Sequence, residues 1–215
     1  MKRPSFSSAF TLIEMITVMA VIAILASLVL AVNSFVQKKS STTKANAEIA
    51  TISSAIANYK ADNGSVPRDN DSDSLNPRTH GSPASGDRDK YKKACLVLYK
   101  AISGDADPLD GRTDTDAKNY APEFFKPANL KMETSTGSNK KPEYIQDPFG
   151  NCYGYSTMGI KAEEEFREKV KSGDRTAKRE AEKGFNPTFD MWSTGGTNVS
   201  GTSLEEARKR WIKNW

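Results

Sequence analysis

One carboxylate near the start of the chain has an unusual setting for a charged side chain. Glu14 stands between Ile13 and Met15, and residues 15–32 that follow are uncharged and mostly apolar. A carboxylate in hydrocarbon is costly unless a cation pairs with it, so such a residue marks a functional position. No Lys or Arg lies within helical reach of Glu14, and the next charge along the chain is Lys38. The counter-ion must therefore come from another chain or from a newly made N-terminus.

Cleavage between Ala9 and Phe10 would create such a cation. The α-amino group of Phe10 would then lie about one helical turn from Glu14 of the same chain. A neighbouring copy could supply its amine to Glu14 in the same way. We therefore expect Glu14 to pair with the amine of Phe10 when copies of the chain associate.

The segment after Glu14 has the length of a membrane-spanning helix. As an α-helix, residues 15–32 extend over about 27 Å, close to the thickness of the hydrocarbon layer. Two alternatives remain open from the residues alone. A cleaved secretory signal is one, because small residues occur near Ala26 to Ala31, although its apolar run is normally shorter. An ordinary membrane anchor with Glu14 at the level of the lipid head groups is the other.

The sequence around the expected cleavage point resembles the signal of type IV prepilins. Residues 9–14 read Ala-Phe-Thr-Leu-Ile-Glu and precede the long apolar run. The resemblance implies that a prepilin peptidase cuts between Ala9 and Phe10 and N-methylates Phe10. It also implies that Glu14 pairs with a neighbour's N-terminus in a filament. Ala9 departs from the glycine usual in the family, and the Gly and Pro often found in its apolar helix are absent here.

Beyond the apolar run the pattern becomes that of an amphipathic helix. Apolar residues recur at steps of three and four, namely Ala45, Ile49, Ile52, Ile56 and Tyr59. We expect this stripe to pack on the chain's own domain, and the segment 10–36 to make contacts between subunits. Glu48 is expected off the stripe. The Asp-Asn-Gly sequence at 62–64 predicts the end of a helix that starts at about residue 8.

The remainder of the chain predicts an α+β domain. Residues 65–90 are polar and predict a loop. The other elements expected are a helix over 91–103, a hairpin over 142–159 with its turn at 147–150, a charged helix over 161–183 interrupted at Gly173, a strand over 188–193, and a last short helix from Ser203 to Trp215.

Motifs in this half are similar to those of the major pseudopilins of type II secretion. They are Asp-Asn-Gly at 62–64, Asp-Pro-Phe-Gly-Asn at 147–151, Trp-Ser at 192–193 and Asn-Trp at 214–215. The resemblance implies a pilin-like fold, with a long N-terminal helix packed on a small C-terminal antiparallel sheet. Residues 65–141 and 160–184 lie outside it and are interpreted as loop and helical insertions.

The resemblance also implies a domain organisation and a set of partners. The regions are a leader at 1–9, a transmembrane and assembly helix at 10–36, its amphipathic continuation at 37–64, and a periplasmic globular domain at 65–215. The expected location is the bacterial inner membrane, crossed once, followed by assembly into a periplasmic pseudopilus. The expected partners are copies of the chain itself, minor pseudopilins, the prepilin peptidase, the inner-membrane assembly platform and membrane lipid.

The composition favours a structural protein over an enzyme. The chain has 215 residues with one His (His80) and two Cys, too few for a His-based triad, a His-rich metal centre or a four-Cys zinc site. His80 is expected to be a solvated loop residue. With 31 basic and 27 acidic residues, a net charge of +4 is too mild and too mixed to predict nucleic-acid binding.

No cofactor is expected, and calcium is the alternative at two loops. Asp105 opens an acidic loop that extends to Asp116, but its spacing fits no EF-hand. The family's calcium loop corresponds to residues 193–202, which contain no Asp or Glu, and Thr197 stands where an aspartate is expected.

The two cysteines and the function each leave alternatives open. Cys95 and Cys152 would lie outside the inner membrane, where they could form a disulfide or remain isolated buried thiols. A true type IV pilin for adhesion, motility or DNA uptake is the alternative within the same class. A membrane-tethered or secreted enzyme with an acidic metal site is the alternative from another class.

Overall fold

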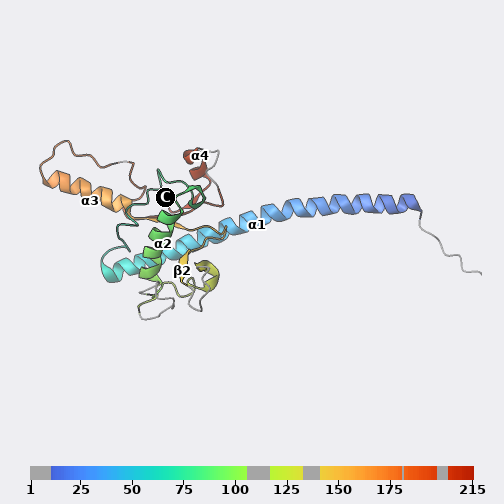
Figure 1. Cartoon of the computed structure of the whole chain (residues 1–215), viewed down its shortest axis with the longest axis horizontal. Coiled ribbons are helices and arrows are strands. Elements are labelled where there is room, and N and C mark those ends of the chain that lie inside the picture. The colour runs from blue at the N-terminus through green and yellow to red at the C-terminus, as the bar shows by residue number, and fades with distance from the viewer. Residues whose placement is uncertain (1–10, 106–116, 133–140, 181, 198–202) are drawn as a thin grey trace, which may run out of the picture. The chain divides into compact units, whose positions relative to one another are not determined.

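The computed structural model describes residues 11–105, 117–132, 141–180, 182–197 and 203–215 (Figure 1). The chain divides into two units, residues 1–41 and 42–215. One helix of 52 residues, α1 (Leu12–Asn63), begins in the first unit and ends in the second. It contains no Gly or Pro, so no residue interrupts its backbone hydrogen bonds. Among the described residues, no helix is both long enough and apolar enough to cross a membrane.

The second unit contains both helices and strands, which confirms the predicted α+β class. Its longer helices are α2 (Arg88–Ile102) and α3 (Met158–Lys171), and a short helix, α4 (Leu204–Lys209), lies near the C-terminus. Two single turns of 3-10 helix occur at Pro83–Ser85 and Pro127–Asn129. The strands are β1 (Leu130–Met132), β2 (Pro142–Ile145), β3 (Gly154–Ser156), β4 (Asp190–Ser193) and β5 (Ile212–Lys213).

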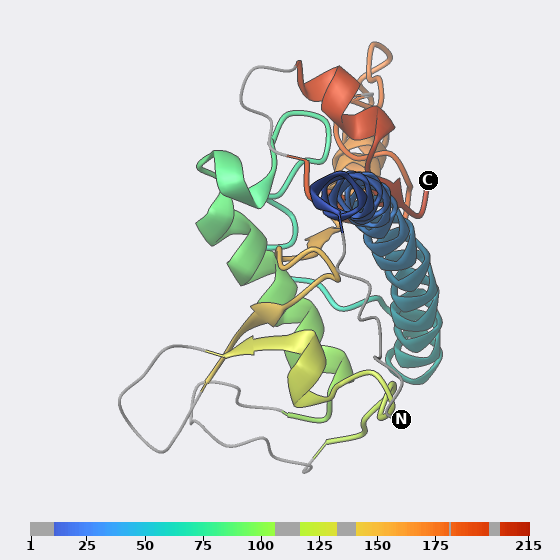
Figure 2. The same cartoon turned by 90° about the vertical axis from the view of Figure 1, so that its right-hand side faces the viewer.

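The strands form two small antiparallel sheets. One pairs β1 with β2, and the other has the order β3-β4-β5. Helix α2 contacts both β2 and β3, and in Figure 2 it runs beside the β1–β2 pair. At the centre of the three-stranded sheet, Trp192 lies opposite Gly154 on one side and Lys213 on the other. A side chain at Gly154 would overlap the indole ring, so this position must be glycine for Trp192 to lie flat against the strand.

The core of the second unit is built around Trp192, which is fully buried. Its indole N–H donates to the hydroxyl of Tyr91 on α2 at 2.9 Å. Its ring stacks on Trp211 at 5.9 Å between centroids and meets Trp215 edge-on at 5.8 Å. The predicted stripe on α1 joins this core: its first four members are buried and Tyr59 is partly buried against them.

The predicted hairpin over 142–159 forms only near its turn, which corrects the expectation of two paired arms. Asp147 organises the turn, because its Oδ1 accepts the backbone N–H groups of Phe149 (3.0 Å) and Asn151 (2.8 Å). Gln146 and Cys152 form an isolated antiparallel β-bridge, and beyond this pair the two arms separate. Strand β2 continues in the sheet with β1, whereas β3 pairs with β4. Each arm therefore finds its hydrogen bonds with a different partner strand.

The last helix also ends earlier than predicted. The Ser203 hydroxyl accepts the backbone N–H of Glu206 at 3.3 Å and caps the start of the helix. However, α4 ends at Lys209, and the next residues form β5 instead of extending the helix to Trp215. Contacts with β4 explain the change, because Trp211 stacks on Trp192 and Ile212 pairs with Ser193, and both residues are buried there.

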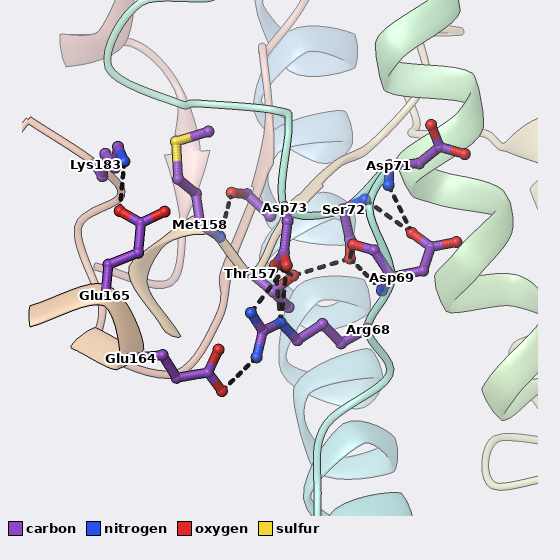
Figure 3. A network of polar contacts seen from close by, with 11 residues as sticks. Arg68, Asp69, Asp71, Ser72, Asp73, Thr157, Met158, Glu164, Glu165 and Lys183 are labelled. Carbon is purple, nitrogen blue, oxygen red and sulfur yellow. Dashed lines mark hydrogen bonds and ion pairs between the residues drawn. The ribbon is translucent and has the colours of Figure 1, made fainter. Parts of the chain in front are cut away.

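Polar contacts fix the loop after α1 (Figure 3), together with the buried side chains of Val66 and Leu75. The Arg68 guanidinium donates from Nε to both carboxylate oxygens of Asp73, at 2.9 and 3.0 Å, and from Nη1 to Glu164 on α3 at 2.6 Å. Thr157, just before α3, donates to Asp73 at 2.7 Å, and Ser72 lies 2.8 Å from the same hydroxyl. These contacts connect the loop to the start of α3.

Candidate assembly surface

The described part of α1 begins with a reciprocal hydrogen-bonded cap made by Thr11 and Glu14. The Glu14 backbone N–H donates to Thr11 Oγ1 at 3.3 Å. In return, the Glu14 carboxylate accepts the backbone N–H and the hydroxyl of Thr11, both at 2.8 Å. This is the capping-box arrangement, which satisfies N–H groups that a helix N-terminus leaves unpaired. The Thr-x-x-Glu spacing is the sequence signal that would have predicted it.

No cation accompanies the Glu14 carboxylate in the part of the chain that the structure describes. Its hydrogen bonds there are those with Thr11, and no ion pair with Lys or Arg is formed. The expected partner, the amine of Phe10, and the cleavage position Ala9–Phe10 lie outside the described residues. Glu14 itself is exposed in this single chain.

Large apolar side chains surround the helix that follows Glu14. They are Leu12, Ile13, Met15, Ile16, Val18, Met19, Val21, Ile22, Ile24, Leu25, Leu28, Phe35 and Val36, each between 52% and 77% exposed. Neighbours such as Ile24 and Leu25 point about 100° apart around the axis, so the set covers the whole circumference. We call this set the apolar sleeve. A helix that is apolar on all sides needs lipid or other helices around it.

The polar side chains within the apolar sleeve satisfy themselves locally. Thr17 donates its hydroxyl to the Glu14 carbonyl at 2.9 Å, and Ser27 donates to the Ile24 carbonyl at 2.7 Å. These hydroxyls can therefore enter an apolar environment without losing a hydrogen bond. Glu14 is then the one charged side chain between residues 4 and 37.

The second half of α1 carries a buried acid that the sequence reasoning placed wrongly. Glu48 is 7% exposed, at the edge of the stripe rather than away from it. Tyr153 donates its hydroxyl to Glu48 Oε2 at 2.6 Å, and Lys44 lies 3.5 Å from Oε1. Burial raises the pKa of the Tyr153 hydroxyl, and its hydrogen bond to Glu48 raises it further. The signal was available, because Glu48 lies three residues after Ala45 and four before Ile52.

The two cysteines lie together in the core as free thiols. Cys95 on α2 and Cys152 after the turn are both buried. The backbone N–H of Ile145 donates to Cys95 Sγ at 3.3 Å. Burial raises the pKa of the Cys152 thiol, and the neighbouring Cys95 thiol raises it further. The Cys152 thiol is therefore protonated at neutral pH, and burial shields both thiols from solvent.

Three of the residues considered for metal binding have described positions, and each has a local hydrogen-bond partner. Asp105 is buried and accepts the Tyr99 hydroxyl at 3.0 Å, while residues 106–116 lie outside the described part of the chain. Thr197 closes a turn through its backbone N–H to Thr194 at 3.0 Å. His80 Nδ1 accepts the backbone N–H of Asn76 at 2.9 Å. Across the residues with described positions, no three metal-ligating side chains come together.

Comparison of the chain with protein-family models, with curated proteins and with solved structures found no match.

Proposed function

We propose that this chain is a structural filament subunit of the type IV prepilin class, closest to a major pseudopilin of type II secretion. The observation that carries the proposal is the Glu14 carboxylate at the start of the apolar sleeve, which has no counter-ion among the residues that the structure describes. The proposed form is pilin-like: α1 is the assembly helix, and the stripe on its second half joins the core to which the strands of the small antiparallel sheets also contribute. The protein acts by polymerising and not by catalysing a reaction.

Assembly replaces one apolar environment with another. In the proposed sequence of events, the leader is cut after Ala9, Phe10 is N-methylated, and the sleeve lies in the bacterial inner membrane. The subunit is then extracted into a periplasmic filament, where sleeves of neighbouring copies pack around a common axis. Contacts between helices take the place of contacts with lipid, so the apolar surface stays out of water throughout.

The Glu14 carboxylate sets the axial register in this scheme. A charge in the apolar interior of a filament is heavily penalised unless a cation meets it. The N-terminal amine of a neighbouring Phe10 meets it only at one axial offset between copies. Any other offset leaves both the amine and the carboxylate unpaired, so the pair selects one offset.

The cap between Glu14 and Thr11 provides a rival explanation for Glu14, and a pair of substitutions separates the two. Glu14→Gln removes the charge but keeps an oxygen that can accept from Thr11, because Gln also forms capping boxes. Thr11→Val removes the capping hydroxyl and keeps the charge. We expect Glu14→Gln to insert in the membrane but not to polymerise, and Thr11→Val to polymerise. Cross-linking of the membrane fraction, read as a ladder of multimers, measures this.

The opposite pattern would refute the pairing role. If Glu14→Gln gives the wild-type ladder while Thr11→Val does not, Glu14 acts as a helix cap and not as a counter-ion. Full polymerisation of both variants would likewise remove the carboxylate from the assembly mechanism.

A further inference from the structure

A small basic pocket lies on the second unit, built by three segments that are far apart in the sequence. Its volume is about 260 Å³, and it is lined by Arg78, Phe185, Glu205, Arg208, Lys209 and Lys213. Pockets for drug-sized ligands enclose roughly 300–1,000 Å³. This pocket therefore suits a small group rather than a large organic molecule.

Aromatic stacking and a backbone carbonyl hold the first of its cations. The ring of Phe185 stacks on Trp215 with centroids 4.6 Å apart. The Arg78 guanidinium lies over the Phe185 ring, 3.9 Å from its centroid. Arg78 Nε donates to the carbonyl of Gly184 at 2.6 Å. The guanidinium is thus fixed in orientation while its Nη1 and Nη2 groups keep N–H donors for another acceptor.

Backbone carbonyls also orient the second cation. Arg208 Nη1 donates to the carbonyl of Arg78 at 2.9 Å and, at 3.4 Å, to that of Pro77. Its guanidinium carbon lies 5.9 Å from the centre of the Phe185 ring. Both guanidinium groups therefore lie near the ring of Phe185, and the backbone carbonyl of Arg78 accepts a hydrogen bond from Arg208. Like charges are brought together here by neutral groups.

The positive charge of the pocket is not neutralised by the described part of the chain. Lys209 pairs with Glu206 at 2.6 Å, but no described carboxylate lies within ion-pair distance of Arg78, Arg208 or Lys213. Lys213 is partly buried, and both burial and the nearby Arg208 lower its pKa. A bound anion would reduce the electrostatic repulsion between Arg78, Arg208 and Lys213.

The buried carboxylate of Asp190 already accepts hydrogen bonds from the backbone of a neighbouring loop. Asp190 is close enough to Arg78 for the guanidinium to counteract part of the rise that burial causes in its pKa. Its two carboxylate oxygens, however, accept the backbone N–H groups of Phe185 at 2.7 Å and Asn186 at 2.8 Å. Asp190 thus supports the loop behind the pocket and does not fill it.

We propose that this pocket is a binding site for a phosphate group. Three unpaired cations and one lining carboxylate, Glu205, leave a net charge of two positive units. A phosphate monoester carries about −1.5 to −2 charge at neutral pH and so matches it, whereas a single carboxylate does not. Guanidinium groups with free N–H pairs bind phosphate oxygens in a bidentate manner. The phosphate can be free, or it can be the monoester head group of a lipid.

Calorimetric titration of the full-length protein in neutral detergent with inorganic phosphate tests the proposal. We expect saturable binding to the wild type at constant ionic strength. We expect an affinity at least roughly tenfold weaker in Arg208→Gln, because a charged hydrogen bond contributes about that much. Lys213→Met provides a second variant that leaves the Arg208 contacts to backbone carbonyls in place. Arg167→Gln is the matched control, since Arg167 is an exposed cation on α3 that pairs with Glu163 and does not line the pocket.

Two competitors identify the source of the phosphate and the selectivity of the pocket. Tighter binding of glycerol 3-phosphate than of inorganic phosphate would assign the pocket to a lipid head group, and the reverse order would assign it to free phosphate. The proposal is overturned if phosphate does not bind saturably, if malonate binds more tightly than either, or if folded Arg208→Gln and Lys213→Met both bind like the Arg167→Gln control.

Discussion

The hydrogen bond between Tyr153 and Glu48 joins the long helix to the globular part of the second unit, and Tyr153→Phe removes only that bond. Tyr153 is fully buried, and Glu48 is 7% exposed. Phe keeps the ring and its packing but leaves Glu48 Oε2 without its donor. The carboxylate is then accompanied only by Lys44, whose side chain is 58% exposed and therefore well hydrated.

The expected loss follows from the charge of the acceptor. A hydrogen bond to a charged group contributes about 1.5–3 kcal/mol, and each kcal/mol shifts the Tm of a unit of this size by about 2–4 °C. Tyr153→Phe should therefore lower the Tm of the full-length protein in detergent by roughly 3–12 °C. Circular dichroism at a helical wavelength measures the transition.

A matched tyrosine and a double-mutant cycle isolate the effect. Tyr155 is also fully buried, but its hydroxyl donates to the neutral carbonyl of Pro67 at 2.6 Å, so Tyr155→Phe should cost less. Tyr153→Phe should also cost less when Glu48 is already Gln, because the neutral amide loses less when its donor is removed. An unchanged Tm in Tyr153→Phe, or the same loss in both backgrounds, would refute the reasoning.

Further predictions concern the core. Gly154→Ala should destabilise the protein by about 1–3 kcal/mol or more, read from the same thermal transition, because its methyl group would displace the buried Trp192; an unchanged Tm would show that the ring can move freely. Cys95 and Cys152 should resist alkylation in the native protein and take up two labels after denaturation without reductant, as counted by intact-mass spectrometry; no label after denaturation would instead establish a disulfide. Burial raises the pKa of Asp147, so its folded-state value lies above its unfolded one and its stabilising contribution is lost as pH rises through the raised value. The Tm of Asp147→Asn should therefore rise relative to that of the wild type as the pH increases above about 4. A difference in Tm between the two proteins that does not change with pH would contradict this.

The sequence predicted the helices better than the strands, for a physical reason. Periodicity and glycine stops identify α1 and α2, because each helix repeats its pattern over several turns. The charged helix expected over 161–183 is shorter than predicted: α3 ends at Lys171, and the described residues 172–180 beyond it are not helical. Strands β1 and β5 have only three and two residues, too few to show alternation. The separation of the arms after the turn at 147–150 depends on which distant strand each arm meets, and local sequence carries no such information.

The candidate sites also differ in whether local sequence could reveal them. Glu14 could be singled out because an isolated acid next to a long apolar run is a local pattern. The burial of Glu48 could have been read from its spacing within α1 but not its partner Tyr153, which lies on a distant segment. The basic pocket has no sequence signature at all. Arg78, Phe185 and Arg208 meet only because the fold brings their three segments together.

The most direct test of the proposed function is mass spectrometry of the N-terminal peptide of the protein isolated from membranes of its native host. The proposal predicts a chain that starts at Phe10 with one added methyl group on its amine, the cation proposed to pair with Glu14. A chain that retains Met1, or one that starts within or after the apolar sleeve, would contradict the proposal.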